Sequence, residues 1–317
     1  MNRSLKIVFY GTPEFATGVL KKLAESDHQV VGVVTAPDKP AGRGRQLQQS
    51  HVKTFAEKKG LNILQPTNLK SEEFIEQLKT LGADLQVVVA FRMLPERVWS
   101  MPPLGTFNLH ASLLPQYRGA APINWAIINR EEKTGVTTFF IDEQIDTGAI
   151  IDQVSCNIEE EETVGTLYGK LMELGANLSL KTVNDIANGP IQTKIQKEAQ
   201  DLKEAPKLNA LNTTLDFNQT AGEVDAMVRG LNPFPIAKAV LIDEEHQNIK
   251  IYQTQIIRRP HKMSPGSIVV ENGKIKVACA TDFIDIFELQ LPNKKRMKAS
   301  DLLNGFQFSP NARFDKA

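Results

Sequence analysis

Three apolar runs separated by helical segments constrain the fold of the amino-terminal half more than any other feature. Residues 5–11, 29–35 and 83–91 are rich in valine, isoleucine and leucine, and the segments between them carry apolar residues at helical spacing. A strand that is apolar along its whole length is buried on both faces, as in a parallel sheet covered by helices. The sequence therefore predicts an α/β fold with a doubly wound, mostly parallel, Rossmann-like sheet.

The strand and helix pattern continues to residue 189 and then changes. Further strands are expected at 106–110, 135–141 and 148–158, and a long helix is expected over 163–188. Gly189-Pro190 is a typical helix end. These segments predict a first domain over residues 1–189, followed by a polar linker over residues 190–206.

The remaining residues, 207–317, predict a second and smaller domain. A helix is expected over 219–230, and the segment NPFP then interrupts the chain. Five short β-like segments follow, at 236–242, 248–257, 266–270, 274–279 and 283–290. Short strands with turn residues such as Glu271-Asn272-Gly273 between them favour a small OB-like β-barrel.

Composition excludes several classes of protein. The chain has no run of about 18 apolar residues and no basic-then-apolar leader, so neither a membrane span nor a secretory signal is expected. Cys156 and Cys279 stand far apart without metal-ligand spacing, which fits a reducing cytoplasm and predicts no metal site. The net charge is zero, but residues 205–317 carry 15 Lys and Arg against 12 Asp and Glu, a local net charge of +3.

The residue types suited to chemistry gather in the segment 107–125. Asn108 and His110 alternate along a short strand, so their side chains lie on the same side of it. Asp146, 36 residues beyond His110, supplies a carboxylate that can orient the imidazole, and Asp142 competes for this role. The block contains no cysteine and no elbow-type serine as nucleophile. The three side chains therefore suit acyl transfer without a covalent intermediate.

These motifs carry a resemblance to a known family. Residues 110–122, HASLLPQYRGAAP, follow Asn108, and residues 141–151, IDEQIDTGAII, contain Asp146-Thr147-Gly148. The sequence resembles the folate-dependent formyltransferases, and the resemblance spans most of the chain. It implies that Asn108, His110 and Asp146 are catalytic and that 10-formyltetrahydrofolate donates the formyl group.

The resemblance also implies a folate site. In the family, a strand end and the loop after the catalytic histidine cradle the pterin ring. The matching residues here are Phe91, Arg92, Met93, Leu94, Ser112, Leu113, Leu114 and Pro115. The chain departs from the common A-Y-G-x-x-L-P form at this strand end, because it has Arg92 and one residue fewer.

Further motifs resemble the members of the family that act on tRNA. Residues 36–50 form a loop with a GRG segment, and such a loop enters the acceptor stem in those enzymes. The second domain has the matching motifs KL, NPFP, PG and KKRM, although Phe217 and Phe234 replace the usual tryptophans. The implied tRNA contacts are Lys39, Arg43, Arg45, Lys207, Lys294, Lys295 and Arg296. The implied acceptor is the α-amino group of methionine on initiator tRNA, and the implied enzyme is a cytoplasmic monomer.

Three other functions remain compatible with parts of the sequence. A formyltransferase for an amino sugar would share the catalytic residues but would lack the basic loop and the second domain. A dinucleotide oxidoreductase would need the G-x-G-x-x-G fingerprint, whereas the first strand-to-helix turn has only Gly11. A tRNA-binding protein without enzymatic activity would leave Asn108, His110 and Asp146 without a role. Arg118 and the basic runs also have ordinary structural explanations, as ion-pair partners or a solvated surface.

Overall fold

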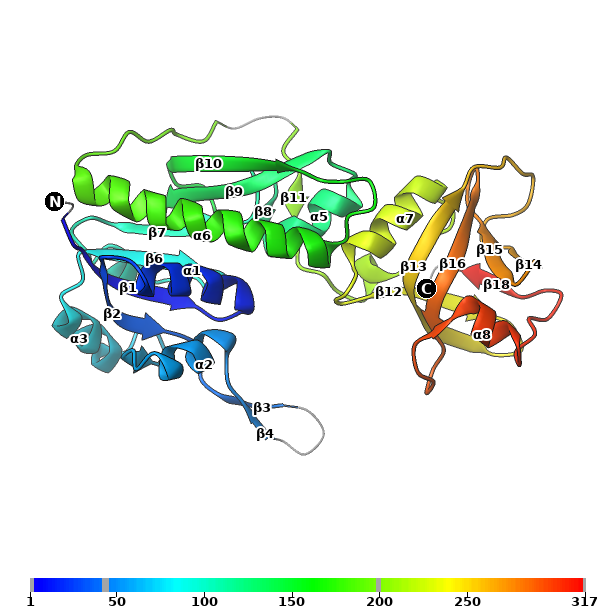
Figure 1. Cartoon of the computed structure of the whole chain (residues 1–317), viewed down its shortest axis with the longest axis horizontal. Helices are drawn as coiled ribbons and strands as arrows, with labels where there is room; N and C mark the ends of the chain where they lie inside the picture. Colours follow the sequence, from blue (N-terminus) through cyan, green and yellow to red (C-terminus); the bar gives the residue numbers. More distant parts are fainter. Residues whose placement is uncertain (1–2, 42–45, 198–200, 316–317) are drawn as a thin grey trace. The chain divides into compact units, whose positions relative to one another are not determined.

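The computed structural model describes residues 3–41, 46–197 and 201–315, and the chain forms two compact units (Figure 1). The first unit comprises Met1–Gly119, Thr134–Cys156 and Tyr168–Glu204. The second comprises Ala120–Lys133, Asn157–Leu167 and Ala205–Ala317. Each unit therefore contains segments that are distant in the sequence, and the short strands β8 (Arg118–Gly119) and β11 (Glu204–Ala205) occur where the chain passes between the units.

The first unit is built on a seven-stranded sheet with the order β10-β9-β7-β6-β1-β2-β5. Neighbouring strands from β7 to β5 are parallel, and β9 is antiparallel to β7. The strands are β1 (Lys6–Gly11), β2 (Gln29–Val34), β5 (Ile63–Leu64), β6 (Leu85–Val89), β7 (Thr106–His110), β9 (Lys133–Phe140) and β10 (Ile150–Asn157). The predicted doubly wound, mostly parallel sheet is confirmed.

Helices cover both faces of this sheet. Helices α1 and α6 lie on one face (Figure 1). Gly18 of α1 lies against Met172 of α6, and Gly175 of α6 lies against Leu109 of β7. On the other face, helices α3 and α4 contribute to an apolar cluster that includes Val8 of β1. The helices of the first unit are α1 (Glu14–Ala24), α2 (His51–Lys58), α3 (Glu72–Leu81), α4 (Glu96–Trp99) and most of α6 (Val164–Asn188). Because helices cover both faces of the sheet, all five residues of β6 are buried.

The strand order of this sheet reverses at β1, and such a reversal marks the edge where ligands bind. From the central strand β1 the chain adds β2 and β5 on one side, and then β6 and β7 on the other. Open α/β sheets bind ligands at the carboxyl ends of the strands where the strand order reverses in this way. His110, the last residue of β7, lies at the carboxyl end of its strand.

The loop over residues 36–50 is more ordered than the sequence suggests. We expected a stretch without secondary structure, but β3 (Lys39–Ala41) pairs antiparallel with β4 (Gln46–Gln48). The prediction missed this hairpin because both strands have only three residues, too few to show an alternating pattern, and β3 includes a proline. Arg43 and Arg45 lie outside the described residues.

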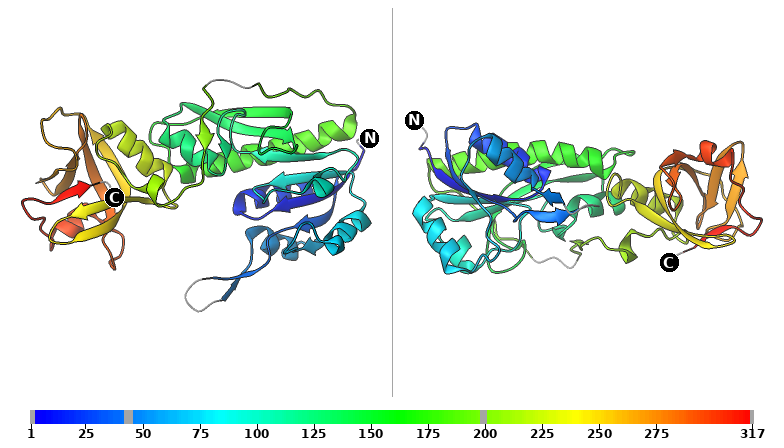
Figure 2. Two further views of the ribbon diagram at one scale, coloured as in Figure 1. Left: turned by 180° about the vertical axis from the view of Figure 1, so that it is seen from behind. Right: turned by 90° about the horizontal axis from the view of Figure 1, so that it is seen from below.

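The second unit contains a curled antiparallel sheet with the order β14-β15-β16-β13-β12-β18, and β17 pairs with β16 (Figure 2). The strands are β12 (Ala237–Ile242), β13 (His246–Ile257), β14 (Ile268–Glu271), β15 (Lys274–Ala278), β16 (Phe283–Gln290), β17 (Met297–Lys298) and β18 (Arg313–Asp315). The helical elements are α5 (Pro122–Ile128), η1 (Leu211–Thr213), α7 (Ala221–Gly230) and α8 (Ala299–Leu303). The five predicted strands and the OB-like fold are confirmed, and two very short strands were missed.

Within the described part of the chain, no helix combines the length and apolar character needed to cross a bilayer. Both cysteines are free thiols, Cys279 buried and Cys156 partly exposed.

Candidate active site

Strand β7 presents the two residues that the sequence singled out. It lies between β6 and β9, and Asn108 pairs with Val88 on one side and Phe139 on the other. Asn108 is partly exposed, and His110 is only 6% exposed. Alternation along the strand directs both side chains to the same face, so an amide and an imidazole lie next to each other at the crevice edge.

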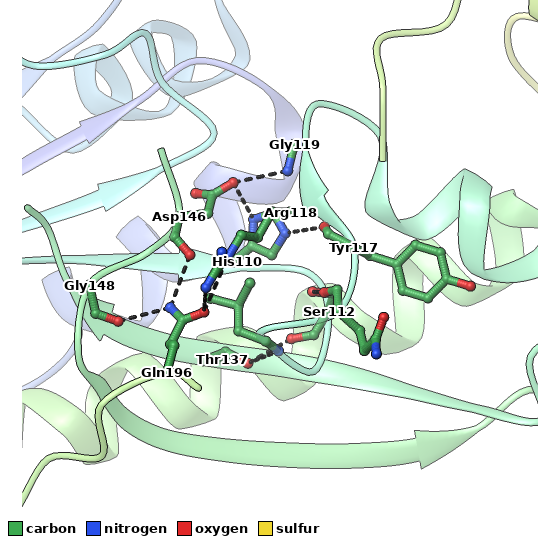
Figure 3. Close-up of polar contacts among 11 residues, drawn as sticks. His110, Ser112, Tyr117, Arg118, Gly119, Thr137, Asp146, Gly148 and Gln196 are labelled. Carbon is green, nitrogen blue, oxygen red and sulfur yellow. Dashed lines mark hydrogen bonds and ion pairs between the residues drawn. The ribbon is translucent and has the colours of Figure 1, made fainter. Parts of the chain in front are cut away.

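A backbone carbonyl determines the tautomer of His110. Its Nε2 lies 2.8 Å from the carbonyl oxygen of Tyr117 (Figure 3). A carbonyl oxygen only accepts hydrogen bonds, so Nε2 carries the hydrogen and donates it. The neutral ring therefore has its lone pair on Nδ1. Tyr117 is itself fixed, because its φ is 60° and its N–H donates to the carbonyl of Lys203 over 2.6 Å.

Asp146 faces this lone pair. Its Oδ2 lies 3.7 Å from Nδ1 of His110, beyond direct hydrogen-bond distance, and accepts a hydrogen bond of 3.0 Å from the N–H of Gly119 (Figure 3). Two acceptors that face each other do not form a hydrogen bond. Once Nδ1 gains a proton, however, the pair becomes a favourable charged one. The site is thus arranged to receive a proton at Nδ1.

The structure separates Asp146 from the competing Asp142. The carboxylate of Asp142 accepts hydrogen bonds from the Gln144 N–H over 3.0 Å and from the Thr147 hydroxyl over 2.8 Å. Asp142 therefore closes the turn 142–147. Asp146 occupies the left-handed region at φ 58°, and its carboxylate points from this turn toward His110.

The loop that follows His110 is held together internally. The Ser112 hydroxyl is fully buried and donates to the carbonyl of Gln116 over 2.6 Å. The Thr137 hydroxyl donates to the carbonyl of Ser112 over 2.7 Å and accepts from the Leu114 N–H over 3.1 Å. Leu114 is also buried (3% exposed), so Ser112 and Leu114 shape the loop. Of the four predicted folate residues in this loop, only Leu113 and Pro115 are partly exposed and available to a ligand.

A pocket of about 370 Å³ opens at the carboxyl ends of β1, β2 and β6. Its lining residues are Thr12, Ala36, Pro37, Lys39, Thr67, Ala90, Phe91 and Arg92. The predicted folate residues divide here: Phe91 and Arg92 line the pocket, Met93 is 63% exposed, and Leu94 is buried.

Arg92 has a fixed orientation in this pocket. Its guanidinium donates to the carbonyls of Thr67, over 3.0 Å, and Pro66, and lies 5.6 Å from the centre of the Phe91 ring. Together with Lys39 it gives the pocket two cationic side chains, which suits an anionic ligand group.

The two halves of the chain match two parts of one enzyme family. Residues 5–183 match the formyl transferase family, and residues 207–307 match its carboxyl-terminal domain. The chain is 51% identical over 310 residues to the methionyl-tRNA formyltransferase of Flavobacterium johnsoniae, and the alignment covers 98% of each chain. The chain belongs to the methionyl-tRNA formyltransferase family. The enzyme of the same name from Flavobacterium psychrophilum is 52% identical over 309 residues, 97% of this chain and 98% of the relative.

A solved structure of lower identity supports the fold of a formyltransferase. The N-formyltransferase from Helicobacter canadensis, in complex with folinic acid and dTDP-3-aminofucose, has a TM-score of 0.65 at 19% identity. The match covers 89% of this chain and 98% of that one.

The predicted tRNA contacts differ in whether their charged groups are free to bind a phosphate. Lys39, Lys207, Lys294 and Lys295 are exposed. Arg296 is also exposed, but its guanidinium pairs with Glu288 and lies 4.5 Å from the centre of the Tyr252 ring. Among the described residues, Arg296 has this ion pair, whereas the four lysines have none.

Gln196 was missed in the sequence analysis, although it contacts both loops of the candidate site. Its side-chain amide bonds to Arg118, which follows the His110 loop, and to the turn that contains Asp146 (Figure 3). The sequence offered no signal for this role, because a single glutamine in a polar segment has no characteristic pattern.

Proposed function

We propose that this chain transfers a formyl group from 10-formyltetrahydrofolate to the α-amino group of methionine on initiator tRNA. The observation that carries this proposal is the lone pair on Nδ1 of His110, which faces Asp146 and lies on the same side of β7 as Asn108. The whole-length identity to methionyl-tRNA formyltransferases supports the choice of donor and acceptor. We further propose that the chain acts in the cytoplasm as a monomer.

His110 serves as the base in this proposal. The methionine amine attacks the formyl carbon with its lone pair and must then lose a proton. Nδ1 of His110 accepts that proton, and Asp146 stabilises the resulting imidazolium across the 3.7 Å gap. General base catalysis of this kind typically contributes about 10²–10⁴-fold to a rate. The same proton returns to N10 of tetrahydrofolate when the carbon–nitrogen bond to the donor breaks.

Asn108 stabilises the charge that develops during attack. The formyl oxygen becomes an oxyanion when the amine adds to the carbon. The side-chain N–H of Asn108 donates to that oxygen, and removal of one such donor typically costs roughly 3–4 kcal/mol of transition-state stabilisation. The neighbouring imidazolium of His110 adds a positive charge that also stabilises the oxyanion. No covalent adduct with the protein is required.

The proposal assigns the remaining candidate residues by region. The donor occupies the crevice bordered by Phe91, Arg92, Leu113 and Pro115 in the domain over residues 1–189. The tRNA contacts Lys39, Arg43 and Arg45 in the segment over residues 36–50. After the linker over residues 190–206, the domain over residues 207–317 adds Lys207, Lys294, Lys295 and Arg296 as further tRNA contacts.

The first test measures formyl transfer to charged initiator Met-tRNA, with uncharged tRNA and free methionine as controls. The wild-type chain is expected to formylate the charged tRNA alone, and His110→Ala is expected to lower turnover by at least about 10²-fold with unchanged circular dichroism. Near-normal turnover of His110→Ala would refute the assignment of the base. Formyl transfer to an amino sugar but not to tRNA would show that the proposed acceptor is wrong.

A further inference from the structure

Gln196 uses every hydrogen-bonding position of its side-chain amide. Its Nε2 donates to the carbonyl of Asp146 over 2.9 Å and to the carbonyl of Gly148 over 2.8 Å. Its Oε1 accepts from Arg118, over 3.2 Å from Nε and 2.6 Å from Nη2. An amide has two N–H donors and one oxygen with two lone pairs, so all four are engaged.

These bonds connect the two loops whose separation sets the distance between His110 and Asp146. The turn at Asp146 is held by its carbonyl, and the loop at Gly119 is held through the adjacent Arg118 (Figure 3). The N–H of Gly119 in turn donates to the carboxylate of Asp146. Gln196 therefore closes a ring of contacts around that carboxylate without touching His110.

The segment that carries Gln196 is anchored on both sides. Lys194 exchanges two backbone hydrogen bonds of 2.8 Å with Ile150, the first residue of β10. Farther along, the carbonyl of Lys203 accepts from Tyr117, the residue whose carbonyl fixes the tautomer of His110. The polar segment predicted as a simple linker thus supports both partners of the imidazole.

We infer that Gln196 is a positioning residue of the reaction centre, which holds the Asp146 carboxylate against His110 by bridging the Asp146 turn to Arg118. The inference rests on the proposed function of His110 and Asp146. Glutamate at this position would still accept from Arg118. It would, however, place an oxygen against the two carbonyl oxygens that now receive hydrogen bonds, so the Asp146 turn would lose its support.

The test is a double-mutant cycle on formyl transfer at saturating donor and Met-tRNA. Gln196→Glu and Gln196→Met are each expected to lower kcat roughly 10- to 100-fold, the cost of a small misplacement of a catalytic group. KM for both substrates should change less than about twofold, because Gln196 is not among the proposed contacts of either substrate. In an Asp146→Asn background the same substitutions should lower kcat less than about twofold, since residues that act through one group are not additive.

The neighbouring Ile195 supplies a matched control. Its side chain is 81% exposed, and Ile195→Ala is expected to leave kcat and KM unchanged. An equal fall in kcat from Gln196→Glu with and without Asp146 would overturn the inference and leave the proposed function intact. Full activity of Asp146→Asn alone would overturn the proposed reaction centre. Gln196→Glu retains the Arg118 contact, so it is the variant to use if Gln196→Met is unstable. The melting temperature of Gln196→Glu is compared with that of Ile195→Ala to show that the variant is folded.

Discussion

At the scale of single residues, Asn108 is the group whose chemistry is easiest to isolate. Asn108→Asp preserves shape but removes the N–H donor and adds a negative charge beside the developing oxyanion. We expect kcat to fall about 10²–10³-fold, as for loss of one oxyanion donor, with little change in KM. Single-turnover formyl transfer measures this loss. Asn62→Asp, at an exposed position of the same unit, is the control, and similar losses in the two variants would contradict the role of Asn108.

The reactivity of the Cys279 thiol reports whether the core of the second unit is packed, and this measurement does not depend on enzymatic activity. Burial, aided by the nearby Asp282 carboxylate, raises the pKa of its thiol to about 12. In the unfolded chain the pKa is ordinary, about 8.5, so the thiolate that reacts with disulfide reagents forms only after unfolding. The contribution of this thiol to the free energy of unfolding is at its maximum below about pH 8.5. It declines as the pH rises toward 12, because the thiol of the unfolded chain loses its proton at lower pH than the thiol of the folded chain.

The measurement uses Cys156→Ser, in which Cys279 is the remaining thiol. At pH 8 a disulfide reagent is expected to label no thiol in the native variant and one thiol per chain in denaturant. Rapid labelling of the native variant would show that Cys279 is accessible, contrary to its 0% exposure.

At the scale of elements, the turn between β9 and β10 depends on a glycine. A Cβ added to Gly148 would lie 1.7 Å from the carbonyl oxygen of Phe140, a distance that only a backbone shift can relieve. Gly148→Ala should therefore displace the Asp146 turn and lower kcat by more than about 10-fold, since catalysis is sensitive to shifts of about 1 Å. Activity and melting temperature are measured together.

Gly169 is the matched control for Gly148. It lies in α6, where an added Cβ would meet no atom within 4 Å, and Gly169→Ala is expected to raise stability by up to about 1 kcal/mol without affecting kcat. If Gly148→Ala behaved in the same way, the close approach at Phe140 would not control the turn.

Which elements the sequence could predict follows from how local their signals are. Asn108 and His110 were placed together correctly because the two-residue period of a strand is a local property. Asp146 lies 36 residues away and was identified through the resemblance of its D-T-G motif. Gln196 was missed because its contacts depend on the path of the chain after α6, which no local pattern encodes. The hairpin at β3 and β4 was missed because its strands are too short to show alternation.

At the scale of the whole molecule, the chain divides in a way that no sequence signal indicated. The second unit takes residues 120–133 and 157–167 from the middle of the sequence, including α5, which packs beside α7. The strand and helix pattern of the sequence changes after residue 189 and again after the polar segment 190–206, so the sequence predicts domain boundaries at those two points. Recruitment of earlier segments is a tertiary property, set by which apolar surfaces become buried together.

The predicted tRNA contacts of the second unit can be tested through their salt dependence. Lys294 and Lys295 are exposed, and neither has an ion pair in the part of the chain that the structure describes. If each lysine neutralises a phosphate, the double change to Gln should raise the Kd for Met-tRNA. The negative slope of log binding constant against log salt concentration should become shallower by about 1 to 2. The KM for 10-formyltetrahydrofolate should stay constant, because the proposed donor site consists of residues of the first unit. Lys70→Gln, an exposed change in the first unit, is the control. An unchanged salt slope in the double variant would show that these lysines do not contact the tRNA backbone, and would leave Lys207 and Arg296 as the remaining candidates of that unit.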